Sequence, residues 1–161
     1  MDHYIMNTPL GSMIIFLSSD KKIIKIEFSH PESGEAGRRI PNNLRSIADQ
    51  FSEYFSGLRK KFNLSFIAKG TPFDQRVWRQ TLKIPYGQTR TYKEIALKIG
   101  KPNSSRAVGG ALKRNPIPII IPCHRVVASN GIGGYTPGLN YKIKLLEFEK
   151  GFVFCNKGKS L

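Results

Sequence analysis

The sequence is poor in cysteine, in long apolar runs and in acidic side chains, and each shortage excludes a class of protein. Its two cysteines, Cys123 and Cys155, lie far apart, which excludes a disulfide framework and, from these residues alone, a zinc site. No apolar stretch approaches the roughly 18–20 residues of a membrane span. The first residues, MDHYIMNTPLG, lack the basic and apolar regions of a secretory signal. We therefore expect a soluble, cytoplasmic protein.

Acidic residues are scarce relative to basic ones: 11 Asp and Glu stand against 26 Lys and Arg, a formal net charge of +15 over 161 residues. Apolar residues make up 40% of the chain, so it can bury a core and is not a disordered polycation. Residues 1–71 carry a net charge of +3, residues 72–150 carry +10 and residues 151–161 carry +2. A polyanion, by default nucleic acid, is the expected partner of residues 72–150. The alternative is general solubilising charge.

Residues 1–71 are expected to form a small α+β unit. Apolar runs and period-two alternation predict strands over residues 13–17, 24–28 and 62–66. Apolar side chains at helical spacing predict a helix over residues 44–58. The stretch from Ser29 to Pro41 is rich in Pro, Gly, Ser and charge, which indicates a loop.

Residues 72–150 are expected to be mainly helical. Capping signals and spacing predict four helices. The first starts at Thr71-Pro72, and the second starts at Thr91, where Glu94 completes a capping box. The third runs from Asn103 or Ser104 to about Arg114, and the fourth spans roughly Asn140 to Phe148. The first should direct Val77, Trp78 and Leu82 to the core. The second and third, joined by a glycine-containing turn, predict a helix-turn-helix. Residues 117–121 indicate a buried strand, and residues 131–138 a glycine-rich loop.

The second helix of the helix-turn-helix is the candidate nucleic-acid reader. Its expected contact face is small and basic, comprising Ser104, Ser105, Arg106, Gly109, Gly110 and Lys113. Two helical glycines cost about 1 kcal/mol each relative to Ala, so something must approach the helix closely, either a DNA backbone or a neighbouring helix. Small residues with one Arg favour a shallow, sequence-tolerant contact such as the minor groove. A purely structural helical hairpin is the alternative.

Residues 119–127 hold the sharpest chemical signal. A buried apolar run ends at Pro122 and then delivers Cys123, His124 and Arg125 together. Only the thiolate is nucleophilic, and a nearby base or cation favours it. The segment therefore suggests an activated nucleophile. A buried structural cysteine with a satisfied histidine is the competing interpretation.

These segments resemble the O6-alkylguanine-DNA alkyltransferases, also called methylated-DNA–protein-cysteine methyltransferases. The likeness covers residues 72–150 in motif order and extends more loosely to Thr8-Pro-Leu-Gly11. The matching motifs are Phe73-Asp-Gln-Arg-Val-Trp78, Ile84-Pro-Tyr-Gly87, Thr91-Tyr92, Arg106-Ala-Val-Gly-Gly110, Asn115-Pro116, Pro122-Cys-His-Arg-Val126, Gly134-Tyr135, Gly138-Leu139, Lys142 and Leu145-Leu-Glu-Phe-Glu149.

The resemblance implies an α+β protein of two domains. Residues 1–71 would be an N-terminal ribonuclease-H-like α/β domain, and residues 72–150 a C-terminal winged-helix-like helix-turn-helix domain carrying the acceptor cysteine, followed by a tail over 151–161. It implies DNA repair by one irreversible transfer of the O6 alkyl group to Cys123 after base flipping. The expected partner is the minor groove of double-stranded DNA, bound without sequence preference by a monomer. No cofactor and no metal are expected.

The resemblance also implies roles for individual catalytic residues. Cys123 accepts the alkyl group, His124 takes its proton through a water, and Glu149 holds His124 in the basic tautomer. Asn115 braces the turn between the recognition helix and the active-site strand. Tyr92 drives rotation of the phosphate and hydrogen-bonds the flipped guanine.

Other matched positions would bind DNA or line the base pocket. Arg106 fills the gap left by the flipped base. Tyr135 forms a wall of the pocket, the backbone N–H of Thr136 faces guanine O6, and the carbonyl of Val126 faces the exocyclic amine. Pro137 stands where Gly or Trp is frequent in the family and is expected to stiffen the loop against bulky adducts.

Two rival functions remain at this point. A lesion sensor of the alkyltransferase-like group binds damaged DNA without transfer, but that group replaces the acceptor cysteine, commonly by Trp, whereas this chain has Cys123. A plain helix-turn-helix regulator would explain the charge but not His124 and Glu149.

Overall fold

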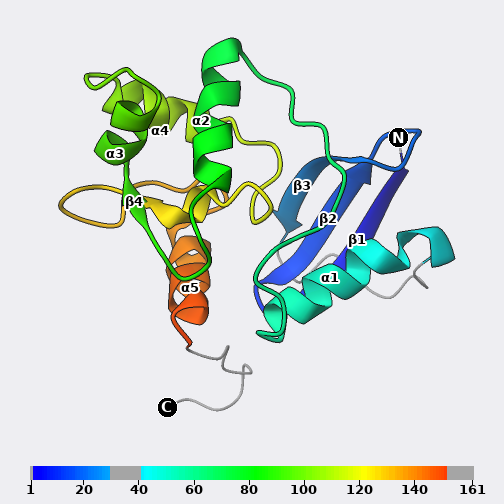
Figure 1. Ribbon diagram of the computed structural model, residues 1–161. Helices are drawn as coiled ribbons and strands as arrows, with labels where there is room; N and C mark the ends of the chain where they lie inside the picture. Colours follow the sequence, from blue (N-terminus) through cyan, green and yellow to red (C-terminus); the bar gives the residue numbers. More distant parts are fainter. Residues whose placement is uncertain (1, 30–40, 152–161) are drawn as a thin grey trace.

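The computed structural model describes residues 2–29 and 41–151 and has two lobes of a mixed α/β fold (Figure 1). The sheet lobe contains β1 to β3 and α1, and the helical lobe contains α2 to α5. The elements are β1 Asp2–Thr8, β2 Gly11–Leu17, β3 Ile23–Ser29, η1 Asn42–Leu44, α1 Arg45–Phe55, α2 Pro72–Leu82, β4 Arg90–Thr91, α3 Tyr92–Lys98, α4 Ser105–Lys113, η2 Cys123–Arg125, β5 Val126–Val127 and α5 Leu139–Glu149. Most of the predicted loop after Ser29, and Cys155 in the tail, lie outside the described residues.

The sheet lobe is an antiparallel sheet in the order β1-β2-β3, with α1 lying across it (Figure 1). Met13, Ile15 and Leu17 of β2 alternate inward and are at most 1% exposed. Phe51 and Tyr54 of α1 are fully buried in the same core. The predicted strands at 13–17 and 24–28 and the helix within 44–58 are therefore confirmed.

The predicted strand over residues 62–66 is wrong. The segment is extended but pairs with β3 at one bridge only, between Ile23 and Phe66. Ile23 N donates to Ser65 O at 3.0 Å, and Ile67 N donates to Ile23 O at 2.8 Å. The alternation correctly indicated one-sided burial, because Phe62, Leu64 and Phe66 all pack against the core. A ladder does not form because Ile23 is the first residue of β3.

Helices α2 and α3 begin at the predicted N-caps, Thr71 and Thr91, and a capping box forms at Thr71 as well as at Thr91, where it was predicted. Thr71 accepts from Asp74 N while the Asp74 side chain accepts from Thr71 N, and Thr91 and Glu94 do the same at α3. Val77 and Trp78 are buried as expected, but Leu82 is 41% exposed, which corrects the predicted core face. The inward position is taken by Thr81, whose hydroxyl donates to Val77 O at 2.8 Å.

The turn between α3 and α4 contains Gly100 at φ +74°, a conformation that glycine adopts without strain. Helix α4 packs against α2, where Trp78 Nε1 donates to Ala111 O at 2.9 Å. Ser104 is the N-cap of α4, but its side chain does not cap the helix. Its hydroxyl instead donates to Lys101 O at 2.6 Å.

Residues 117–121 are buried as predicted, but they form a turn rather than a strand. Ile121 N donates to Ile117 O at 3.0 Å, and Ile119 lies at φ +74°. Pro116 and Pro118 flank the start of the turn, and proline has no N–H to donate to a ladder. The chain therefore bends sharply before it reaches Pro122, which precedes η2.

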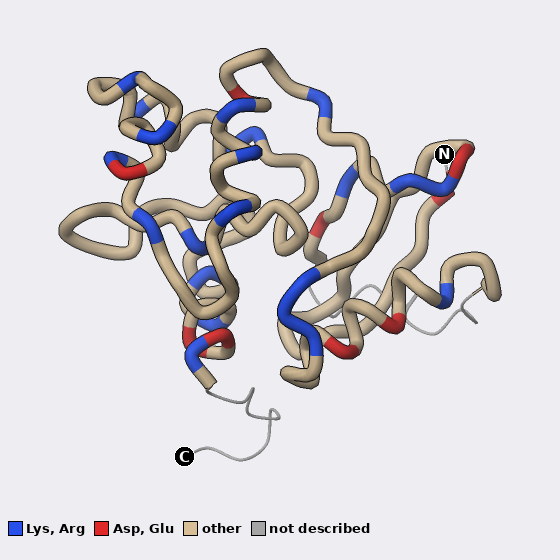
Figure 2. Tube along the Cα trace, in the orientation of Figure 1, with Lys and Arg blue, Asp and Glu red and all other residues tan. Residues whose placement is uncertain are grey.

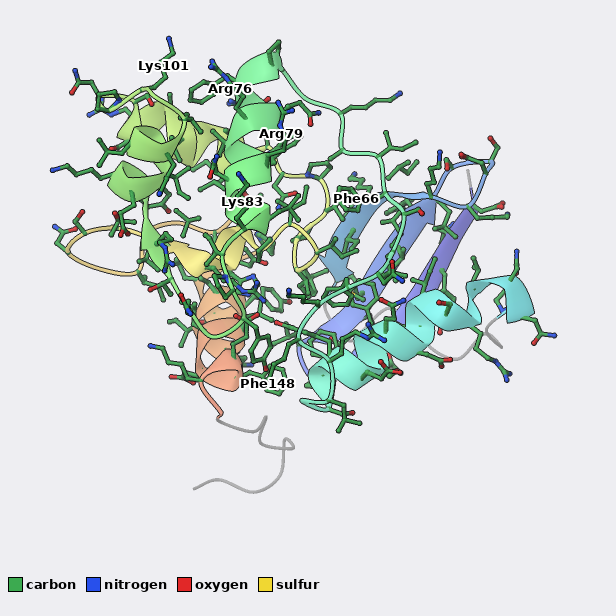
Figure 3. All side chains as sticks on the ribbon, viewed as in Figure 1. Phe66, Arg76, Arg79, Lys83, Lys101 and Phe148 are labelled. Carbon is green, nitrogen blue, oxygen red and sulfur yellow. The ribbon has the colours of Figure 1, made fainter. Side chains whose placement is uncertain are left out.

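The two lobes meet around α5. Tyr54 of α1 lies edge-on to Phe148 of α5 at 5.7 Å between ring centroids, and Phe28 of β3 stacks on Tyr141 at 5.2 Å. Figure 3 shows Phe148 on the side of α5 that faces α1. Ile26 N also donates to Pro116 O at 2.9 Å. Within the described residues, no helix is long and apolar enough to cross a membrane.

Candidate active site

Cys123 begins η2, directly after the turn at residues 117–121, and its side chain is 6% exposed. Asn115 fixes this turn by three hydrogen bonds. Its Nδ2 donates to Ile121 O at 2.9 Å and to Cys123 Sγ at 3.1 Å, and its Oδ1 accepts from Ile117 N at 2.9 Å. The bracing role predicted for Asn115 agrees with these contacts, and its amide also touches the sulfur.

Burial controls the chemistry of the thiol. It raises the pKa of Cys123 to about 11, against the opposing effects of the Asn115 amide, the Lys142 ammonium and backbone N–H groups. The side chain is therefore a thiol at neutral pH. A base that removes its proton is a requirement of any nucleophilic role.

His124 and Glu149 lie together beside Cys123, joined by 2.8 Å between His124 Nε2 and Glu149 Oε1. Arg125 holds the same carboxylate with Nη2 at 2.8 Å from Oε1 and Nε at 2.9 Å from Oε2. The structure thus brings together residues from η2 and the last position of α5. Arg125 also donates to Ile84 O at 2.9 Å, which ties η2 to the segment after α2.

The electrostatics of this cluster leave His124 neutral and Glu149 ionised. Burial would raise the pKa of Glu149, but hydrogen bonds and charge interactions with His124 and Arg125 outweigh it and hold that pKa well below its usual range. Burial lowers the pKa of His124 against the attraction of Glu149. With the Nε2 proton donated to the carboxylate, Nδ1 is the basic atom. Nδ1 is buried and has no hydrogen-bond partner among the described residues.

Lys142 is a member of the site whose role was not predicted. Its side chain is fully buried on α5, and Nζ donates to Val126 O at 2.6 Å and to Gly134 O at 2.9 Å. These bonds close the loop between the two carbonyls over Cys123. Burial lowers the pKa of Lys142 to about 8, partly offset by Cys123. The sequence did contain a signal for this role: Lys142 falls at helical spacing with the core residues Leu145 and Phe148, so a charged side chain occupies a buried face.

A cavity of about 150 Å³ lies between α4 and Cys123. Its walls come from α3, α4 and the loop before α5, and they are Tyr92, Gly109, Leu112, Lys113, Cys123, Gly134, Tyr135 and Thr136. Of the predicted base-pocket residues, Tyr135 and Thr136 therefore line this cavity. The Val126 carbonyl is already bonded to Lys142, although a carbonyl oxygen can accept a second hydrogen bond.

Cys123 also borders a second cavity of about 330 Å³, which reaches β3 of the sheet lobe. Its lining includes Thr136 and Pro137, Pro118, and Phe28 of β3. Pro137 therefore lines this second space rather than the cavity beside α4. The thiol stands between the two cavities.

The predicted contact face of α4 is accessible. Arg106 and Lys113 are exposed, and Ser105, Gly109 and Gly110 are partly exposed. A Cβ on Gly109 would meet only the Tyr92 ring, at 3.8 Å, and one on Gly110 would meet the flexible Arg114 guanidinium at 3.3 Å. Packing within the described residues therefore does not require glycine at these two positions.

Lys and Arg positions are distributed over the helices and loops of the helical lobe (Figure 2). Besides Arg106 on α4, Arg76, Arg79 and Lys83 project along one side of α2 (Figure 3). Two acids of this lobe are engaged in contacts within it: Asp74 in an ion pair with Arg114 at 2.7 Å, and Glu94 in its capping box. The predicted concentration of positive charge over residues 72–150 thus lies on the lobe that carries the thiol.

The fold and the site together define a class: mixed α/β proteins with a buried cysteine beside a histidine–glutamate pair. The family model "6-O-methylguanine DNA methyltransferase, DNA binding domain" matches residues 72–151. A probable methylated-DNA–protein-cysteine methyltransferase of Acanthamoeba polyphaga mimivirus is 45% identical over 148 residues, covering 91% of this chain and 95% of that protein. A methylated-DNA–protein-cysteine methyltransferase of Methanosarcina barkeri is 42% identical over 158 residues, covering 93% of this chain and 98% of that protein.

Solved structures agree with the sequence relatives. The crystal structure of Mycobacterium tuberculosis OGT in complex with DNA matches with a TM-score of 0.82, at 38% identity and over 92% of both chains. The chain belongs to the methylated-DNA–protein-cysteine methyltransferase family.

Proposed function

We propose that the protein repairs O6-alkylguanine, mainly O6-methylguanine, in duplex DNA by irreversible, stoichiometric transfer of the alkyl group to Cys123. One observation carries the proposal: the Cys123 thiol lines the cavity of about 150 Å³ whose other wall is α4. A guanine in the stack cannot reach this thiol, so the nucleotide must first be flipped out of the duplex. Relatives named for this reaction support the same chemistry.

The chemical step is an in-line displacement at the methyl carbon. The Cys123 sulfur forms the new S–C bond as the C–O6 bond breaks, and the thiol proton passes through a water to His124 Nδ1. Glu149 stabilises the resulting imidazolium, following the nucleophile, base and orienter logic of hydrolytic triads. Guanine leaves with the electrons of the C–O6 bond and takes a proton from water at N1, while the His124 imidazolium releases the thiol proton to solvent.

Negative charge on the leaving guanine needs donors in the cavity. Tyr92 accepts from Gly134 N at 3.2 Å, which leaves its own proton available for the base. The backbone N–H of Thr136 is the second candidate donor. Preorganised donors of this kind stabilise charge that develops in a transition state.

The division into a ribonuclease-H-like domain over 1–71, a winged-helix-like domain over 72–150 and a tail remains part of this proposal. We infer that α4 enters the minor groove, where the exposed Arg106 fills the space of the flipped base. The small surface at Gly109 and Gly110 supports a close approach of the DNA backbone. Ser104, Ser105 and Lys113 would contact phosphates. A monomeric state and a cytoplasmic location stay predictions.

Intact mass spectrometry tests the transfer directly. The protein is incubated with a duplex containing O6-methylguanine, and we expect a mass increase of one methylene group located on Cys123. Cys123→Ala should bind the duplex and gain no mass. Retained binding without an adduct in the unaltered protein would instead favour the lesion sensor or the regulator.

Arg106→Ala tests the base-flipping role. Removing the side chain should slow methyl transfer from duplex DNA about a hundredfold, since stabilisation of an extrahelical base is worth a few kcal/mol. Reaction with a free O6-alkylguanine base should change little, because that substrate is not stacked. Equal losses on the two substrates would contradict the role.

A further inference from the structure

The catalytic carboxylate also has a hydrogen-bond donor from the other lobe. Tyr54 lies on α1, 95 residues before Glu149, and its hydroxyl donates to Glu149 Oε1 at 2.7 Å. Tyr54 is fully buried. The same oxygen accepts from His124 and Arg125, so three donors from two lobes converge on one atom.

We propose that Tyr54 is a positioning residue of the transfer reaction, fixing the Glu149 carboxylate and moderating its pull on His124. This inference rests on the proposed function, in which His124 is the base. In this role, Tyr54 makes the sheet lobe contribute a side chain to the active site. Periodicity does not distinguish this role, because Tyr54 occupies an ordinary apolar position of an amphipathic helix.

The hydroxyl of Tyr54 is held rigidly in place. Its ring packs against Phe62 at 5.3 Å, Phe148 at 5.7 Å and Tyr86 at 6.1 Å between centroids. Burial and the negative Glu149 raise the pKa of Tyr54 well above its ordinary value. The phenol therefore remains protonated across the working pH range and acts as a permanent donor.

The donated hydrogen bond has a chemical consequence for His124. A carboxylate that accepts a strong hydrogen bond is less basic, and so it stabilises an adjacent imidazolium less. Without the hydroxyl, Glu149 would favour protonation of His124, and only neutral His124 can take the proton of Cys123. The other groups facing His124 are Arg125 and Lys142, which act against its protonation, while the Tyr86 ring packs against the Arg125 guanidinium.

The test is the pH dependence of single-turnover methyl transfer in Tyr54→Phe, measured by the adduct on Cys123. We expect the acid limb of the rate profile to move to higher pH by about one unit, as loss of one hydrogen bond to a charged group allows. Tyr86→Phe is the matched control. It removes a phenol from the same aromatic cluster but no hydrogen bond to Glu149 among the described residues, and it should keep the original profile.

A second variant keeps the test decisive if Tyr54→Phe folds poorly. Replacing Tyr54 with 3-fluorotyrosine makes the phenol a stronger donor and should move the acid limb to lower pH. Profiles that match the unaltered protein in both variants would overturn the positioning role. A protein with no adduct on Cys123 in any form would instead refute the proposed function, so the two failures are distinguishable.

Discussion

Asn115 is the residue whose side chain both shapes the turn before Cys123 and touches the sulfur. Its amide donates to Ile121 O and to Sγ, and its carbonyl oxygen accepts from Ile117 N. A donor beside the sulfur stabilises the thiolate as the proton leaves. A substitution that changes the charge of this side chain but keeps its acceptor for Ile117 N can therefore separate the structural function of Asn115 from its chemical function.

Asn115→Asp and Asn115→Ala provide that separation. Both lose the amide donor, but Asp keeps the acceptor for Ile117 N and places a negative charge next to the developing thiolate. We expect Asp to be at least as stable as Ala in urea unfolding and yet at least tenfold slower in methyl transfer, a difference of about 1.4 kcal/mol in activation. Equal transfer rates would contradict an electrostatic role for the amide.

For single residues, the sequence predicted the side chains that react but not the side chains that hold them in place. Cys123, His124 and Glu149 were predicted because they fall in motifs, and the structure brings them together. Tyr54 and the bonding role of Lys142 were not predicted, because each looks like part of a helical core pattern and their contacts come from distant chain segments. Such hydrogen bonds depend on how the lobes meet, which periodicity does not encode.

Helix α4 carries two glycines that its packing does not require. A Cβ at Gly109 would make an ordinary 3.8 Å contact with the Tyr92 ring. Alanine there should raise the free energy of unfolding by about 1 kcal/mol through helix propensity. The same methyl group would stand on the face of α4 that we propose approaches DNA.

Gly109→Ala is therefore expected to be more stable and to bind duplex DNA more weakly, by about tenfold in Kd or 1.4 kcal/mol. Urea unfolding and fluorescence anisotropy with an unmodified duplex measure the two effects. Ser52→Ala, an exposed substitution in α1, is the control and should leave duplex affinity unchanged. Stability gained with no loss of affinity would show that α4 does not approach the duplex closely.

Signals from neighbouring residues predicted where helices start better than whether an apolar segment forms a strand. The capping boxes at Thr71 and Thr91 involve neighbours in the chain, and both form. The apolar run at 117–121 is buried and the alternating one at 62–66 is partly buried, but neither forms a strand. In the first the partner strand begins only at Ile23, and in the second prolines interrupt the ladder. Burial follows from composition, whereas pairing depends on the rest of the fold.

The whole molecule combines a basic surface with a buried charge cluster. Exposed Arg and Lys on α2 and α4 supply a sequence-independent attraction to phosphates, which salt weakens. The cluster of His124, Arg125 and Glu149 lies where the two lobes meet, within reach of Tyr54. Its protonation should therefore affect the stability of the assembly as well as the reaction.

Acid should destabilise the protein through this cluster. The folded-state pKa values of Glu149 and His124 lie below their ordinary values of 4.5 and 6.5. The unfolded chain therefore binds protons more readily as pH falls. The stabilisation from each group is complete above its ordinary pKa and is lost as pH falls toward the folded value. The free energy of unfolding should decline below about pH 6.5 and more steeply below about 4.5.

Glu149→Gln isolates the larger contribution. At pH 7 it leaves Arg125 buried without its carboxylate, which should cost about 3–5 kcal/mol in urea unfolding. That penalty should narrow below about pH 4.5, because the unaltered protein then loses the advantage of its ionised carboxylate while the variant has none to lose. Glu147→Gln, on the exposed side of α5, is the control and should show no comparable penalty. A penalty for Glu149→Gln that stays constant from pH 7 to the acid limit would mean that Glu149 acts by packing, because a charge contribution must titrate with the carboxylate.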